Sequence, residues 1–306
     1  MDSLIARCLR SLLLIAAGGL LAAQSPSPPP GTFFIVGMGT APDLITVRAQ
    51  RVIERADILM AEEGAFESVW AGLVRGRKTW EWPHDLRRFY GADPTALPDP
   101  RQLAEAERLD KIRRRLVEKI TAAVAAGKTV ACLQGGDPMM YGMTLFFEML
   151  PPNVPTEVVP GVGAFQAGSA ALKMSPPYGY DTNAVILTLR DWPGRVDVNE
   201  KLTANGSTMV FYTMALDYPS LFAQLKRYYP PDTPVAVVCD AGDLERQKVI
   251  RSTVARFLDE VRHRSLPPDR HILFVGKFLK VGQVRKDFIA NKDLLSPSTP
   301  ATTARE

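Results

Sequence analysis

Three short glycine-rich segments are the residues of this sequence best suited to holding a ligand. They are Gly37-Met-Gly39, Gly135-Gly136-Asp137-Pro138 and Pro160-Gly-Val-Gly-Ala164, and each follows a run of apolar residues. Glycine lets the backbone approach a ligand closely and adopt positive φ angles. The Asp137 carboxylate can accept hydrogen bonds from an amine or a hydroxyl. The sequence therefore predicts a binding site built largely from backbone amides and carbonyls.

Other kinds of chemistry find little support. The three cysteines, Cys8, Cys132 and Cys239, are too scattered for a disulfide framework or a Cys-x-x-Cys metal site. Three histidines offer no catalytic triad and no metal centre, so we expect no bound metal. A net charge of +4 does not require a nucleic-acid partner, although a modestly basic surface suits a substrate with several carboxylates.

Short apolar runs alternate with longer amphipathic segments from residue 31 onward. This order is typical of strand-helix-strand units. The clearest helix covers Arg101–Ala126, and a second is expected over Met140–Leu150. We therefore predict an α/β fold with two lobes, each a mainly parallel or mixed sheet with flanking helices. The expected strands are Phe33–Val36, Asp57–Met60, Thr129–Leu133, Glu157–Val159, Val185–Leu189, Met209–Tyr212, Val235–Cys239 and Ile272–Val275.

Proline-rich stretches divide the chain. Residues 1–30 hold a short basic start, an apolar run and a proline-rich spacer, which is typical of a cleaved export signal. The apolar run of about 13 residues spans only about 20 Å, so no stable membrane anchor is expected after cleavage. The alternatives are an internal apolar helix or a wrongly assigned start. We predict an N-terminal lobe over 31–153, a C-terminal lobe over 154–283 and a polar tail over 284–306.

Taken together and in order, the motifs resemble those of the tetrapyrrole (corrin/porphyrin) methylase family. The likeness extends from about Thr32 to Phe278, essentially the whole body of the chain. One departure is an opening glycine loop about one residue shorter than the usual family form, so the contact that the family's proline makes is absent or moved to Thr40. The segments that carry the likeness are 33–49, Gly135-Gly-Asp-Pro-Met-Met-Tyr-Gly142, Val159-Pro-Gly-Val-Gly-Ala-Phe-Gln-Ala167, Thr208-Met-Val-Phe-Tyr-Thr-Met214 and Thr233–Ala241 followed by Val249–Thr253.

The resemblance implies a methyltransferase that binds S-adenosylmethionine in a cleft between the two lobes. It also implies a small-molecule acceptor, a tetrapyrrole similar to a precorrin, because the second-lobe run 233–253 looks most like the precorrin-4 C11-methyltransferases. A homodimer is a further expectation from the family. The cofactor contacts implied by the resemblance are Gly135, Gly136, Asp137, Met140, Gly163, Ala164, Thr213 or its neighbour Met214, and Ala241.

No catalytic base stands out, since a sulfonium methyl donor needs mainly alignment with its acceptor and exclusion of water. Weak candidates are Asp43, Tyr141 and, in the segment from Trp80 to Arg101, His84 or Asp85. This segment looks longer and more aromatic than the usual family connection. It is therefore either a substrate lid or a packed surface loop.

Two alternatives to a tetrapyrrole methyltransferase remain open. Relatives with this fold modify peptide backbones or other acceptors, and the aromatic segment could serve a peptide. An exported binding protein that has lost catalysis is the second alternative, motivated by the predicted signal. Because S-adenosylmethionine is made in the cytoplasm, cofactor supply favours a cytoplasmic location and the N-terminus favours export, so the location stays open.

Overall fold

The computed structural model describes residues 31–280 except 68–69, 74–75, 94, 96, 98, 179–181, 183 and 193–194. The predicted export signal and polar tail lie outside these residues. The boundaries proposed for the two lobes stay predictions. None of the helices in the described part of the chain is long and apolar enough to cross a membrane.

The N-terminal lobe is built on a five-stranded parallel sheet in the order β3-β2-β4-β1-β5. Its central strands are apolar runs buried on both faces, as expected where helices cover a parallel sheet. The elements are β1 (Phe33–Gly37), α2 (Val47–Arg55), β2 (Ile58–Glu62), β3 (Lys78–Trp82), α3 (Pro100–Ala125), β4 (Val130–Gln134), α4 (Leu145–Met149) and β5 (Thr156–Val159).

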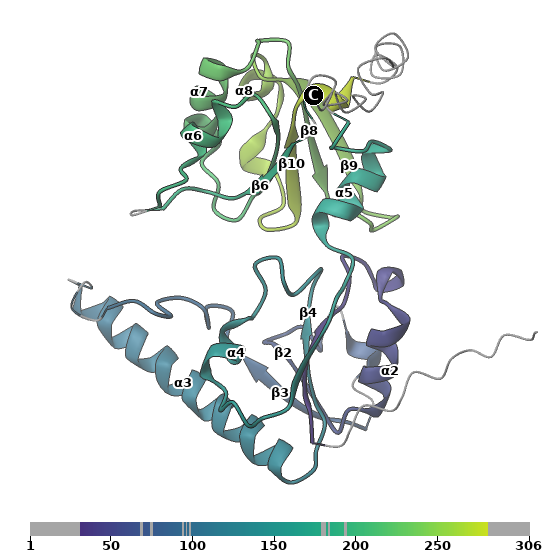
Figure 1. The fold of residues 1–306 in the computed structure, drawn as a ribbon, viewed down its shortest axis with the longest axis vertical. Coiled ribbons are helices and arrows are strands. Elements are labelled where there is room, and N and C mark those ends of the chain that lie inside the picture. The colour runs from purple at the N-terminus through teal and green to yellow at the C-terminus, as the bar shows by residue number, and fades with distance from the viewer. Residues whose placement is uncertain are drawn as a thin grey trace, which may run out of the picture.

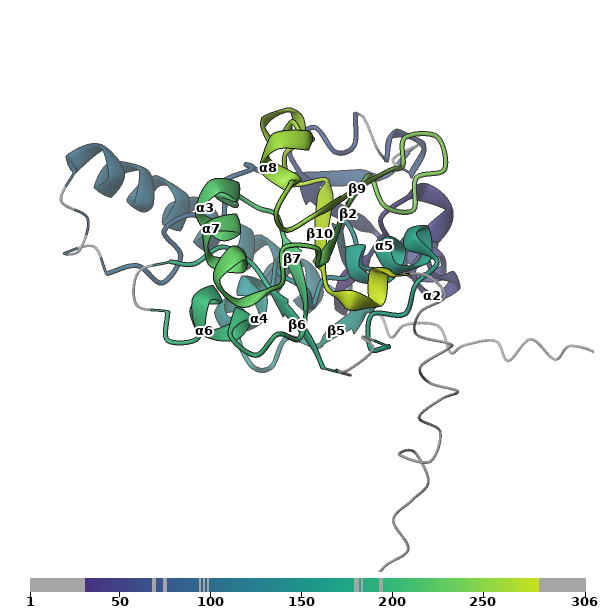
Figure 2. The ribbon, with the colours of Figure 1, turned by 90° about the horizontal axis from the view of Figure 1, so that it is seen from above.

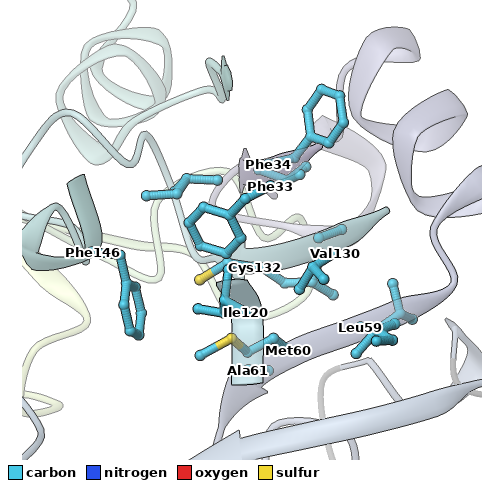
Figure 3. Packing of buried hydrophobic residues seen from close by; sticks show 14 of the residues in the cluster. Phe33, Phe34, Leu59, Met60, Ala61, Ile120, Val130, Cys132 and Phe146 are labelled. Atoms are coloured by element: carbon cyan, nitrogen blue, oxygen red, sulfur yellow. The ribbon is translucent and has the colours of Figure 1, made fainter. Parts of the chain in front are cut away.

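The core of this lobe lies between the sheet and its helices. Phe33 from β1 and Phe146 from α4 are buried and meet edge to face, with ring centroids 5.9 Å apart. Figure 3 shows Cys132 and Met60 from neighbouring strands packed around them, with Ile120 of α3. Cys132 is fully buried, and burial raises the pKa of its thiol, so it serves as a small apolar side chain.

The C-terminal lobe has a five-stranded mixed sheet in the order β6-β7-β10-β8-β9. Only β6 and β7 are parallel, and β10 is inserted antiparallel between β7 and β8. The elements are α5 (Ala164–Leu172), β6 (Val185–Thr188), α6 (Asn199–Thr203), β7 (Thr208–Tyr212), α7 (Tyr218–Tyr228), β8 (Pro234–Cys239), β9 (Lys248–Thr253), α8 (Phe257–Glu260) and β10 (His271–Val275).

The two lobes stand one above the other, joined by the chain that leads from β5 into α5 (Figure 1). Seen from above, the C-terminal lobe covers the N-terminal sheet, while α3 extends beyond it on one side (Figure 2). This arrangement brings the carboxyl ends of the parallel strands to face the second lobe. In α/β sheets that edge is where ligands bind.

The structure confirms the predicted α/β fold and corrects three details. Two strands were missed, β3 and β9, and both lie at sheet edges, where exposed residues break the apolar run. Trp80 and Trp82 therefore belong to a strand and not to an inserted loop. The helix expected over Met140–Leu150 was wrong in its first half, because α4 begins only at Leu145.

Candidate functional site

A cleft of about 1510 Å³ lies between the lobes at the carboxyl ends of the parallel strands. Its N-terminal wall comes from the loops after β1 and β4, and its opposite wall from the ends of β7 and β8 and the start of β10. The turn that begins α5 completes the floor with Gly163 and Ala164. The glycine-rich segments predicted from the sequence thus meet in one place.

The glycine loops interlock through their backbones. Gly39 and Gly136 form a two-residue bridge, in which the Gly136 amide donates to the Gly39 carbonyl at 2.7 Å and the reverse bond is 3.3 Å long. Gly37 packs against Gly161 so closely that a Cβ on Gly37 would lie 2.4 Å from the Gly161 nitrogen. Glycine is therefore required at positions 37 and 161 by the contact of loop with loop.

Gly135 differs from its neighbours. A Cβ built there has no atom of the described residues within 4 Å, apart from its two chain neighbours. The φ angle of Gly135 is not positive, so neither packing nor backbone geometry requires glycine. Because Gly135 lines the cleft, the free space beside it is space for a ligand. Gly136, in contrast, has a φ of +71°, which side chains disfavour.

All the cofactor contacts implied by the family resemblance line this cleft. They come from separate segments of the chain that the fold brings together. These residues are Gly135, Gly136, Asp137 and Met140 after β4, Gly163 and Ala164 at α5, Thr213 and Met214 after β7, and Ala241 after β8. That the cofactor touches them stays a prediction.

Two buried hydroxyls in the cleft wall have no hydrogen-bond partner among the residues that the structure describes. One is Oγ1 of Thr40, in the first glycine loop, and the other is the phenol of Tyr212, at the end of β7. A buried polar group without a partner costs about 1–3 kcal/mol. A ligand that offers hydrogen-bonding atoms to both lobes would satisfy them, and this fits a polar cofactor such as S-adenosylmethionine. Tyr212 was not singled out from the sequence, because only its burial distinguishes it.

Tyr212 contacts Tyr141 of the opposite lobe edge to face at one side of the cleft, with ring centroids 5.1 Å apart and planes at 70°. Burial, with smaller contributions from Tyr141 and Asp137, raises the pKa of Tyr212 to about 12. The Phe165 amide lowers this pKa slightly without reaching hydrogen-bonding geometry. Burial also raises the pKa of Tyr141. Both phenols stay protonated at neutral pH, which suits them to donate hydrogen bonds.

The other candidate bases lie at or beyond the rim. Asp43 and Asp85 are exposed and do not line the cleft. His84 does not line it either, but its Nδ1 lies 2.9 Å from Oε1 of Glu62, which does. Glu62, at the end of β2, was missed because its position follows from the strand order. The assignment of a catalytic base stays a prediction.

Acidic side chains dominate the charge of the cleft. Among the described residues six of them line it against three arginines, although the whole chain is basic. The arginines have partners within the protein: Arg270 pairs with Asp240 at 3.1 Å and Arg246 with Asp243 at 2.6 Å, while Arg77 donates to backbone carbonyls of α2. Within the described ranges no three His, Cys, Asp or Glu side chains gather to hold a metal ion.

Known proteins resemble this chain over most of its length. The siroheme synthase of Hydrogenovibrio crunogenus is 28% identical over 283 residues, which are 90% of this chain and 54% of the relative. The cobalt-precorrin-4 C(11)-methyltransferase of Methanocaldococcus jannaschii is 26% identical over 254 residues, 80% of this chain and 87% of the relative. The chain thus spans about half the length of the siroheme synthases that it matches.

Solved structures show the same fold. A cobalt precorrin-4 methyltransferase, a cobalamin biosynthetic enzyme, superposes with a TM-score of 0.62 at 22% identity, covering 82% of this chain and 96% of the other. The uroporphyrin-III C-methyltransferase of Thermus thermophilus, solved with S-adenosylhomocysteine, has a TM-score of 0.56 at 21% identity, with coverages of 81% and 98%. A family model described as tetrapyrrole (corrin/porphyrin) methylases matches residues 32–257. The chain therefore belongs to the tetrapyrrole methylase family.

Proposed function

We propose that this protein transfers a methyl group from S-adenosylmethionine to a tetrapyrrole similar to a precorrin. One observation carries the proposal: the residues that the family resemblance implies for the cofactor, drawn from four segments of the chain, line a single cleft. The two unpartnered hydroxyls of Thr40 and Tyr212 in its wall support the same reading. The names of the relatives, which include precorrin and uroporphyrin methyltransferases, support the substrate class.

The size of the cleft favours a large acceptor. Pockets for a single small ligand measure about 300–1,000 Å³. The volume of about 1510 Å³ here leaves room for a second ligand beside a nucleoside cofactor. A flat macrocycle uses such space better than one side chain of a peptide. A peptide acceptor remains the alternative within methyl transfer.

The residues of the chain would contribute position and exclusion of water. The free space beside Gly135 would admit the cofactor. Backbone amides and carbonyls beside Gly136 and Gly163 would form hydrogen bonds with its polar groups. Tyr212 and Thr40 would donate hydrogen bonds from opposite lobes. Bound S-adenosylmethionine supplies an electrophilic methyl group. Because orientation alone can contribute several kcal/mol to such a transfer, the site needs no strong nucleophile of its own.

The test is methyl transfer by the full-length chain. The purified protein is incubated with S-adenosylmethionine labelled in its methyl group and, in turn, a cobalt-precorrin, a uroporphyrin-III-type tetrapyrrole and an unrelated peptide. We expect label in a tetrapyrrole and none in the peptide. Label in the peptide alone would replace the substrate proposal, and a chain that binds neither S-adenosylmethionine nor S-adenosylhomocysteine would refute the cofactor proposal.

A further inference from the structure

The turn after the Gly-Gly-Asp-Pro motif is held from outside the cleft by an arginine of a neighbouring segment. Arg87 lies in the turns between β3 and α3, more than fifty residues away along the chain. Its guanidinium donates to the carbonyl of Gly142 at 2.7 Å and to the carbonyl of Tyr141. One nitrogen thus joins two successive carbonyls of the loop that faces the ligand space.

The segment that carries Arg87 is itself firmly anchored. Arg113 of α3 is only 2% exposed and donates to the carbonyls of Leu86, at 2.9 Å, and Arg88, at 3.2 Å, the two residues that flank Arg87. Further along, the hydroxyl of Tyr90 donates to Glu148 of α4 at 2.8 Å. These contacts favour the packed loop over the lid among the two interpretations of this segment.

The conformation that Arg87 holds is one that the loop does not adopt by local preference. Tyr141 has a φ of +62°, which is unfavourable for a residue with a large side chain. The next residue must be glycine, because a Cβ on Gly142 would lie 2.3 Å from the Pro138 carbonyl oxygen. Backbone strain of this kind persists only where surrounding contacts hold it.

This conformation places the Tyr141 ring in the cleft, against Tyr212 of the opposite lobe. We infer that Arg87 is a positioning residue of the cofactor site: anchored on α3 through Arg113, it fixes Tyr141 so that the tyrosine pair closes one side of the ligand space. The inference rests on the proposed function, since it takes the occupant of that space to be the adenosyl cofactor.

The experiment measures binding of S-adenosylhomocysteine to the full-length chain by calorimetry. We expect Arg87→Ala to weaken binding roughly tenfold, as for the loss of two hydrogen bonds from a charged donor. Arg87→Lys should restore affinity to within about threefold, because an ammonium can still donate to these carbonyls. The matched control is Arg88→Ala, which removes the same charge next door but contacts Asp85 and Phe89 instead of the loop.

A double-mutant cycle separates positioning from general stability. In a Tyr141→Ala background, Arg87→Ala should weaken binding no further, because the ring it positions is gone. Equal affinities of Arg87→Ala and wild type, or an undiminished tenfold loss in the Tyr141→Ala background, would overturn the positioning role while leaving the proposed function intact. A wild-type chain that does not bind S-adenosylhomocysteine would overturn both.

Discussion

Substitutions at Gly135 provide the most direct test of the cofactor site. Gly135 lines the cleft, and a side chain added here enters open space, since no atom of the described chain beyond the two adjoining residues lies within 4 Å of the Cβ position. Alanine adds one carbon to that space and valine adds three. Each methylene-sized contact that the ligand loses costs about 0.8 kcal/mol. We therefore expect Gly135→Ala to weaken S-adenosylhomocysteine binding about 4-fold, and Gly135→Val, at about 2.4 kcal/mol, about 60-fold.

The same substitutions should leave the fold unharmed. Because Gly135 has no neighbour at the Cβ position and no positive φ, the free energy of unfolding should stay within about 1 kcal/mol of wild type. The contrasting variant is Gly37→Ala, whose Cβ would collide with Gly161. It should destabilise the protein by about 3 kcal/mol even without ligand.

Calorimetric titration and urea unfolding of the same preparations check both halves of this prediction. The increase in lost affinity from alanine to valine matters more than either value, because it shows that the added side chain takes up space that the ligand needs. A folded Gly135→Val variant that binds S-adenosylhomocysteine as tightly as wild type would show that the ligand does not lie against this loop, and the reasoning from the empty Cβ position would fail.

Three further predictions concern buried polar groups. Tyr212→Phe removes an unpartnered hydroxyl, so the ligand-free protein should gain about 1 kcal/mol in urea unfolding while S-adenosylhomocysteine binding weakens about fivefold; a less stable variant would show that the hydroxyl has a partner. Arg113→Met leaves the Leu86 and Arg88 carbonyls without their donor and should lower the free energy of unfolding by about 3 kcal/mol, measured by thermal unfolding. The control is Arg114→Ala, which removes an exposed pair with Asp110 and should lower it by less than about 1 kcal/mol. Burial lowers the pKa of His271 in the folded state, so the unfolded chain binds a proton first as the pH falls below about 6.5. The free energy of unfolding should therefore be constant above about pH 7.5 and smaller at about pH 5.5. His271→Gln should show a weaker dependence on pH, because the titrating group is gone.

The sequence predicts the parts of the fold that depend on local pattern. The strands around Phe33, Val130 and Val235 are apolar because both faces of their sheets are covered, and such runs are visible without a structure. The edge strands β3 and β9 alternate between exposed and buried residues or are largely exposed, so no apolar run marks them. Their strand conformation comes from pairing with β2 and β8, the strands that precede them in the chain, and no apolar run announces that pairing.

The candidate site, like the fold, contains residues that the sequence predicts and residues that it does not. Its glycine loops were predictable because backbones that turn tightly or pack closely need glycine, and the glycines are visible in the sequence. The turn around Tyr141 was mistaken for helix because its positive φ is held by Arg87, a contact made through the tertiary structure. Tyr212 looks ordinary as a residue type, and only its burial without a partner indicates a role.

Charge shows why average composition does not predict a substrate. The chain is basic as a whole, which would suit an acceptor with several carboxylates, yet the described lining of the cleft has six acidic side chains and three arginines. Since Arg246 and Arg270 already pair with Asp243 and Asp240, acceptor carboxylates would have to compete with those partners. A general electrostatic attraction therefore cannot select a tetrapyrrole here. The substrate proposal depends instead on the size of the cleft and on family membership, and a direct assay with competing acceptors is what distinguishes tetrapyrrole from peptide.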